Sequence, residues 1–111
     1  MVRKVESKEE FYQQTGLLKL TIVDFFAVWC GPCKMIAPFL EELDAKFADV
    51  DFIKVDVDEL EELAGECGIT AMPTFQFYRD GKKVAEVKGA NKAKLEDLIS
   101  AHHKEDKVNQ A

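Results

Sequence analysis

The sequence contains little of what several classes of protein require. Its apolar runs fall far short of the roughly 20 residues that span a bilayer, and its N-terminal segment has no apolar core of the kind a secretory signal needs. Three cysteines are too few, and odd in number, for a secreted disulfide scaffold. Proline, glycine and serine form no linker, and no segment repeats. These absences favour a cytoplasmic protein.

Basic charge is also scarce. Lysine and arginine number 15 against 21 acidic residues, which gives a net charge of −6. Such a chain repels phosphate backbones, so we expect no nucleic-acid partner. A length of 111 residues with 47% hydrophobic composition suits one domain with its own core. We therefore expect a single domain over residues 1–111, with a polar, frayed tail at about 104–111.

What the sequence does contain is an alternation of helical and extended patterns. A capping box, Ser7 to Glu10, predicts a first helix. A second begins near Pro32, with an apolar stripe spaced four, three and four at Ile36, Leu40, Leu43 and Phe47. Asp58 and Glu61 can cap a third helix, and Asn91 can cap the last. Extended runs lie between them at 18–28, 52–57, 74–78 and 83–87, the last two forming a hairpin. This order predicts an α/β fold, a mixed sheet with helices on both faces.

Two of the cysteines lie close together, in Trp29-Cys30-Gly31-Pro32-Cys33. Such a pair can bind zinc, but zinc needs about four ligands, and only Cys67, His102 and His103 remain. Adjacent histidines on a helix point in different directions, so we expect no metal site. A purely structural disulfide is also disfavoured, because so short a loop restricts the unfolded chain little. The pattern favours redox chemistry.

The position of the pair suggests different roles for its two members. Cys30 lies just before the first helical turn, where free N–H groups and the helix dipole favour a thiolate. Cys33 is three residues before Ile36 and shares the inward, apolar face of the helix. We expect an exposed, acidic Cys30 that attacks and a sheltered Cys33 that resolves.

Asp24 interrupts the apolar run of residues 20–26. A carboxylate buried there loses hydration, so its pKa should rise, and it could carry a proton for the Cys33 thiol. Lys54, on the neighbouring extended run, is a candidate partner that modulates it. The alternative is an Asp24 that faces solvent on an edge strand.

The segment Val23-Asp24-Phe25-Phe26-Ala27-Val28-Trp29-Cys30-Gly31-Pro32-Cys33-Lys34 resembles the active-site segment of thioredoxins. Pro38, the run Ala71-Met72-Pro73-Thr74-Phe75 and the pair Gly89-Ala90 match in order. The resemblance covers roughly residues 2–101 and is strongest to eukaryotic cytosolic thioredoxins. It implies the thioredoxin fold, a central five-stranded mixed sheet in the order 1-3-2-4-5 flanked by four helices, and a cis peptide before Pro73.

The resemblance also implies a substrate-binding rim. Substrate segments would pair with the Met72 backbone as an added strand. The rim residues are Trp29, Gly31, Pro32, Met72, Pro73, Gly89 and Ala90. Position 71 is alanine where some animal thioredoxins have a cysteine, which excludes dimerisation through that thiol, and we expect a monomer. Cys67 is either a regulatory thiol or a small buried hydrophobe.

The implied function is that of a protein disulfide reductase, an electron carrier in cell redox homeostasis. Dithiol–disulfide exchange through Cys30 and Cys33 would reduce disulfide-containing proteins, and an NADPH-dependent thioredoxin reductase would restore the dithiol, with no cofactor bound to this chain. Two alternatives stay open: a non-catalytic thioredoxin-like binding module, and a disulfide oxidase or isomerase domain. Pro32 between the cysteines and the missing secretion signal argue against the second.

Overall fold

The computed structural model describes residues 1–109, with side chains to residue 106. Within them, helices and strands alternate and a hairpin precedes the last helix, as the sequence predicts. In chain order they are β1 (Arg3–Lys4), α1 (Lys8–Thr15), β2 (Thr21–Phe26), α2 (Gly31–Lys46), β3 (Asp51–Asp56), α3 (Glu61–Glu66), β4 (Thr74–Arg79), β5 (Lys82–Lys88) and α4 (Lys92–Asn109).

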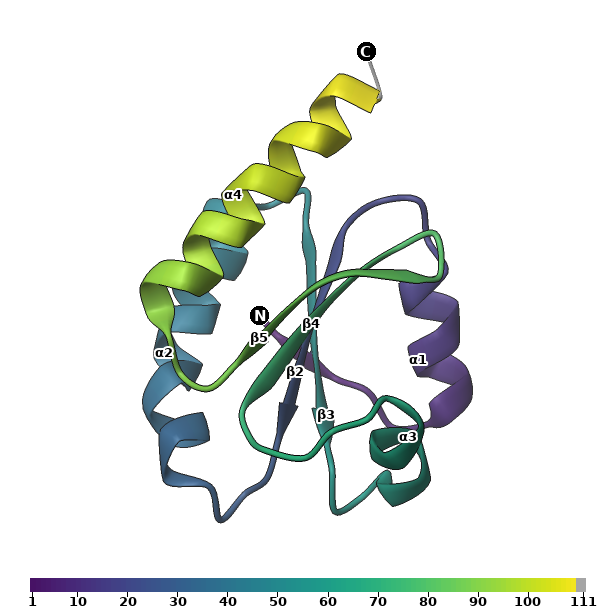
Figure 1. Cartoon of the computed structure of the whole chain (residues 1–111), viewed down its shortest axis with the longest axis vertical. Coiled ribbons are helices and arrows are strands. Elements are labelled where there is room, and N and C mark those ends of the chain that lie inside the picture. The colour runs from purple at the N-terminus through teal and green to yellow at the C-terminus, as the bar shows by residue number, and fades with distance from the viewer. Residues whose placement is uncertain (110–111) are drawn as a thin grey trace.

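The strands form one mixed sheet in the order β1-β3-β2-β4-β5, which confirms the predicted order. β1, β3 and β2 run parallel, while β4 is antiparallel to β2 and to β5. Figure 1 shows α2 and α4 on one side of the sheet and α1 and α3 on the other. β2 is therefore central and covered on both faces, which explains why its sequence is an almost unbroken apolar run.

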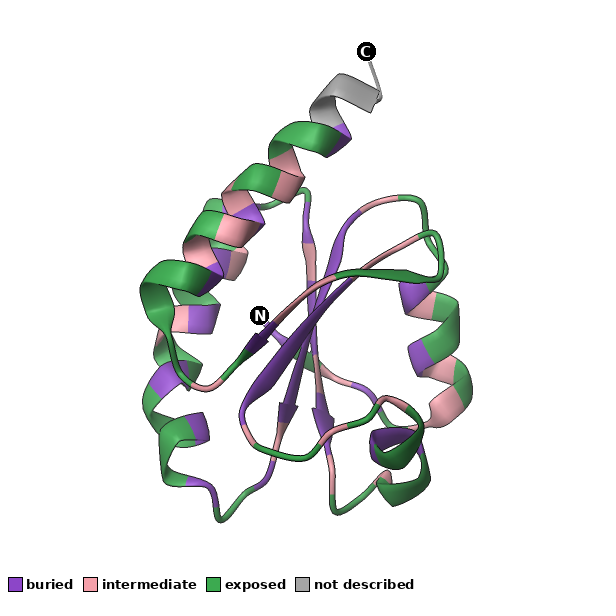
Figure 2. Cartoon of the chain, viewed as in Figure 1, coloured by how far each residue is buried: buried purple, intermediate pink, exposed green. Residues whose placement is uncertain are grey.

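The hydrophobic core has one layer on each side of the sheet (Figure 2). The predicted stripe lies in the first layer, with Ile36, Leu40 and Leu43 of α2 and its C-cap Phe47 all buried. The second layer includes Phe11 of α1 and Leu63 of α3. Each fully buried side chain of this size contributes about 1.5–3 kcal/mol. These two layers hold β2, and with it the start of α2, in place.

Most of the predicted helix ends and turns are confirmed. Ser7 Oγ accepts a hydrogen bond from the Glu10 N–H at 3.1 Å, and Asn91 Oδ1 accepts one from the Lys94 N–H at 3.1 Å. The hairpin turns at Asp80 and Gly81, whose φ angles of 55° and 75° lie in the left-handed region.

Two predictions about chain ends and caps are wrong. α3 begins after Leu60 without a side-chain cap, because Asp58, the expected cap, is engaged elsewhere. The frayed tail expected from about residue 104 is instead helical to Asn109; residues 110–111 lie outside the described part. The reason is Asp106, a buried carboxylate that pairs with Arg79 and accepts a hydrogen bond from the Leu20 N–H at 3.0 Å. Over residues 1–109, no helix combines the length and apolarity needed to cross a membrane.

Candidate active site

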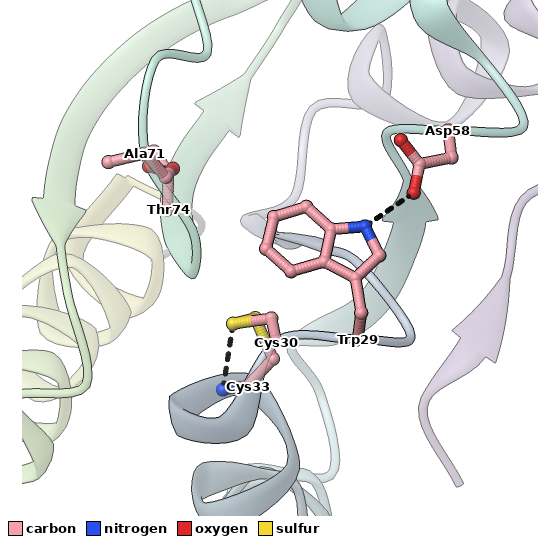
Figure 3. Close-up of a disulfide and its surroundings, with 6 residues drawn as sticks. All are labelled: Trp29, Cys30, Cys33, Asp58, Ala71 and Thr74. Atoms are coloured by element: carbon pink, nitrogen blue, oxygen red, sulfur yellow. Dashed lines mark hydrogen bonds between the residues drawn. A yellow bond between two sulfur atoms is a disulfide. The ribbon is translucent and has the colours of Figure 1, made fainter.

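The cysteine pair lies where β2 passes into α2. Cys30 is the N-cap of α2 and has an extended backbone, and its Sγ accepts a hydrogen bond from the Cys33 N–H at 3.2 Å. Pro32 follows in the first turn, where its missing N–H costs nothing. A disulfide joins Cys30 and Cys33, whose Cα atoms are 5.3 Å apart (Figure 3).

The prediction that Cys30 is exposed and Cys33 sheltered is wrong for this disulfide form. Cys30 is 5% exposed and Cys33 is 4% exposed. Both pack in one small cluster with Ala27, and Met72 packs against this cluster. What distinguishes the two sulfur atoms is their polar surroundings, because Cys30 caps the helix while Cys33 faces a cavity behind the disulfide.

Asp24 lies near the middle of β2 and is 5% exposed. It is in register with Lys54 of β3 and Phe75 of β4, so the alternative of a solvent-facing residue on an edge strand is excluded. Its Oδ1 has no hydrogen-bond partner among the described residues. Burial raises the pKa of Asp24 from 3.8 to about 7, although the positive charge of Lys54 acts in the opposite direction.

One cavity of about 250 Å³ is lined by Asp24, Lys54 and Cys33. The Lys54 ammonium also lies 5.6 Å from the centroid of the Phe26 ring, a cation–π contact. A titratable carboxyl group and Cys33 therefore line the same cavity. A proton can move between them through water in such a space.

Trp29 is held in front of the disulfide by a residue that the sequence analysis did not identify. Trp29 is 65% exposed and so does not belong to the core, and its indole Nε1 donates to Asp58 Oδ2 at 2.9 Å (Figure 3). The Asp58 N–H donates in turn to Asp56 Oδ1 at 2.9 Å. No spacing rule links positions 29 and 58, because the contact arises only when β2 and β3 lie side by side.

The loop before β4 faces the cysteines from the other side. The Met72–Pro73 peptide bond is cis, and the Pro73 carbonyl accepts a hydrogen bond from the Gly89 N–H at 2.8 Å. Gly89 has a φ of 89°, a conformation that favours glycine. This bond joins the Met72–Pro73 and Gly89–Ala90 parts of the predicted rim. Gly31 and Pro32 are exposed at the start of α2.

Cys67 lies apart from this site. It is the half-buried C-cap of α3 and packs against the core layer that contains Phe11 and Leu63. Burial raises the pKa of the Cys67 thiol, although a hydrogen bond from Tyr78 acts in the opposite direction. No group of three or more histidine, cysteine, aspartate or glutamate side chains within the described residues is placed to hold a metal ion.

The chemistry available here follows from the two sulfur atoms. A disulfide closed across the first turn of a helix can accept two electrons and open to a dithiol, which then reduces another disulfide. The site therefore defines the chain as a thiol–disulfide oxidoreductase. The thioredoxin family model matches residues 2–101, and the chain belongs to the thioredoxin family.

Individual relatives agree over nearly the whole chain. Thioredoxin from Mus musculus is 50% identical over 104 residues, covering 92% of this chain and 99% of its own. Thioredoxin-1 from Schizosaccharomyces pombe is 51% identical over 102 residues, with the same two coverages of 92% and 99%. The crystal structure of Malassezia sympodialis thioredoxin superimposes with a TM-score of 0.88 at 45% identity, covering 92% of this chain and 93% of that one. With the Cys30–Cys33 pair in the active-site position, the chain is a protein disulfide reductase.

Proposed function

We propose that Cys30 attacks substrate disulfides and that Cys33 resolves the product. The Cys30 thiolate bonds to one substrate sulfur and releases the other as a thiolate, which takes up a proton. The Cys33 thiolate then bonds to Cys30 Sγ and releases the second substrate thiol. The substrate gains two electrons and two protons, and Cys30–Cys33 becomes a disulfide. The observation that carries this assignment is the N-cap position of Cys30, whose Sγ accepts the Cys33 N–H and so favours negative charge on that sulfur.

Asp24 is the proposed proton acceptor for the Cys33 thiol. The resolving step requires Cys33 as a thiolate, although helix capping favours the thiolate of Cys30. A carboxyl group with a pKa near 7 changes protonation state near neutral pH, and it lines the same cavity as Cys33. Lys54, in register with Asp24, modulates this group by opposing the rise in its pKa.

Substrate chains are proposed to bind in front of the disulfide as an added strand along the Met72 backbone. The exposed indole of Trp29, the Gly31–Pro32 turn and the joined Pro73 and Gly89 loops supply the surrounding surface. Their apolar character suits an extended segment of a partner protein, since main-chain hydrogen bonds supply affinity while side-chain pockets select the sequence.

The proposed cellular setting is the cytoplasm, where a monomer without a bound cofactor receives electrons from NADPH through thioredoxin reductase. The family membership and the similarity to eukaryotic thioredoxins support this. Regulation at Cys67 stays a prediction, and the raised pKa of its half-buried thiol favours a packing role instead.

Reduction of insulin disulfides by the chain, coupled to NADPH and a thioredoxin reductase, tests the proposal. We expect multiple turnovers with the wild type, and loss of turnover in both Cys30→Ser and Cys33→Ser. A binding module would instead keep its partners and its cellular effect when both cysteines are replaced. Catalysis that persists in either single variant would contradict the two-cysteine cycle.

A further inference from the structure

The cavity behind the disulfide has polar groups that the fold leaves unpaired. It is lined by Asp24, whose buried Oδ1 has no hydrogen-bond partner among the described residues. Lys54 and Lys34 also line it, and neither forms a salt bridge with any residue whose side chain the structure describes. Lys54 is half-buried and Lys34 is exposed. The buried Asp24 Oδ1 is thus a free hydrogen-bond acceptor in the interior, and the two lysines place positive charge nearer to solvent.

The remaining walls are apolar, and the space is small. The apolar residues of the lining are Phe26, Ala27, Val28 and Ala37. A volume of about 250 Å³ lies just below the roughly 300–1,000 Å³ of pockets that take drug-sized ligands. It therefore suits a molecule with one aromatic ring, whose faces can lie against Phe26 and the aliphatic side chains.

The charged residues of the cavity determine which chemical group the ligand should carry at each end. A cation would gain the Asp24 carboxyl but would be repelled by both lysines, so an anionic group facing the lysines is favoured. The unpaired Oδ1 of Asp24 requires a donor, and it can accept from a hydroxyl whether or not the other carboxyl oxygen is protonated. A neutral hydroxyl at the inner end satisfies it without adding charge to the interior.

We propose that this cavity is a binding site for a small hydroxylated aromatic carboxylate, with its carboxylate at Lys54 and Lys34 and its hydroxyl at Asp24. The site concerns the disulfide form that the structure shows. It does not depend on the proposed role of Asp24 in proton transfer, because binding is measured here without catalysis.

The test titrates the oxidised, ¹⁵N-labelled protein with 4-hydroxybenzoate and follows amide chemical shifts. We expect changes centred on the residues that line the cavity and a dissociation constant on the order of 1 mM, as usual for so small a ligand. Benzoate, which lacks the hydroxyl, and methyl 4-hydroxybenzoate, which lacks the charge, should each bind about fivefold to tenfold more weakly. Equal binding of all three compounds, or shifts confined to other surfaces, would overturn the proposal without need of any variant.

Three variants complete the design. Lys54→Met should weaken 4-hydroxybenzoate binding about tenfold or more, and Ala37→Leu should weaken it by filling the cavity. Lys94→Met, an exposed lysine on α4 outside the cavity lining, is the matched control and should bind as the wild type does. Spectra of the free variants establish that each is folded. Equal weakening by Lys94→Met and Lys54→Met would show general attraction to positive charge and would refute a built site.

Discussion

The indole Nε1 of Trp29 donates a hydrogen bond to Asp58 Oδ2 at 2.9 Å, and this contact holds a largely exposed ring beside the disulfide (Figure 3). Trp29 follows β2 and Asp58 follows β3, two parallel neighbours whose carboxyl ends meet at one edge of the sheet. The acidic side chain therefore orients the aromatic one from a different part of the chain.

Loss of this hydrogen bond should weaken substrate reduction. In Asp58→Ala the ring loses its acceptor, and we expect kcat/KM for insulin reduction to fall roughly threefold to tenfold, the range for the net contribution of one ordinary hydrogen bond. Asp58→Asn keeps an acceptor oxygen and should recover most of the activity. Glu59→Ala, the exposed neighbouring acid, is the control for lost negative charge. Equal losses in Asp58→Asn and Asp58→Ala would mean that charge, not orientation of the ring, matters.

The raised pKa of Asp24 makes stability depend on pH. Its folded value of about 7 lies above the ordinary 3.8, so the folded protein holds the proton more tightly than the unfolded chain does. Wild type therefore loses stability as pH rises through about 4 to 7, while the amide of Asp24→Asn loses none at this position. We expect the variant to be more stable at about pH 8 by up to roughly 4 kcal/mol, and nearly equal to wild type at about pH 3.

Urea denaturation at the two pH values measures this difference. Glu42→Gln, on an exposed position of α2, removes one negative charge without removing a buried one and serves as the control. A stability gain of the same size at both pH values would show that ionisation of Asp24 is not its cause. A variant less stable than wild type at the higher pH would contradict the burial cost altogether.

Trapping of mixed disulfides with substrate proteins distinguishes the attacking cysteine from the resolving one. Cys33→Ser leaves Cys30 at the helix N-cap, so mixed disulfides should form and persist with substrate proteins. Cys30→Ser leaves only Cys33, which lies inside α2 and not at its N-cap. Its thiolate is therefore less favoured, and this variant should trap little or none. Non-reducing electrophoresis with and without added dithiothreitol measures the adducts. Similar yields from the two variants would reverse or abolish the assignment.

The ion pair between Arg79 and Asp106 should stabilise the end of α4. Asp106→Ala leaves a largely buried guanidinium and the Leu20 N–H without their acceptor, so we expect a loss of about 3 kcal/mol in unfolding free energy. Glu105→Ala is the matched control, because Glu105 lies 3.6 Å from Arg79 but its side chain is 58% exposed. Its loss should be below about 0.5 kcal/mol. Thermal and urea unfolding of both variants provide the comparison, and equal effects would contradict the anchoring role.

Much of the fold is predictable because its signals are local. The capping box at Ser7, the four-three-four spacing of the α2 stripe and the turn at Asp80–Gly81 each concern residues within a few positions of one another. Period and capping depend on backbone geometry that neighbouring residues share, and they are readable without tertiary contacts. The apolar run around Asp24 likewise indicated a buried strand and a buried carboxyl group.

Contacts between distant segments were decided only by the tertiary structure. The sequence by itself determined the element order, the dithiol at a helix start and the buried acid behind it. It did not determine that Asp58 would orient Trp29 rather than cap α3, or that Asp106 would extend α4 by pairing with Arg79. It also did not show that Cys30 would be buried as fully as Cys33 in the disulfide form. The physical reason is the same in each case: a polar or apolar group takes the best partner that packing brings within reach, and that partner can lie far away along the chain.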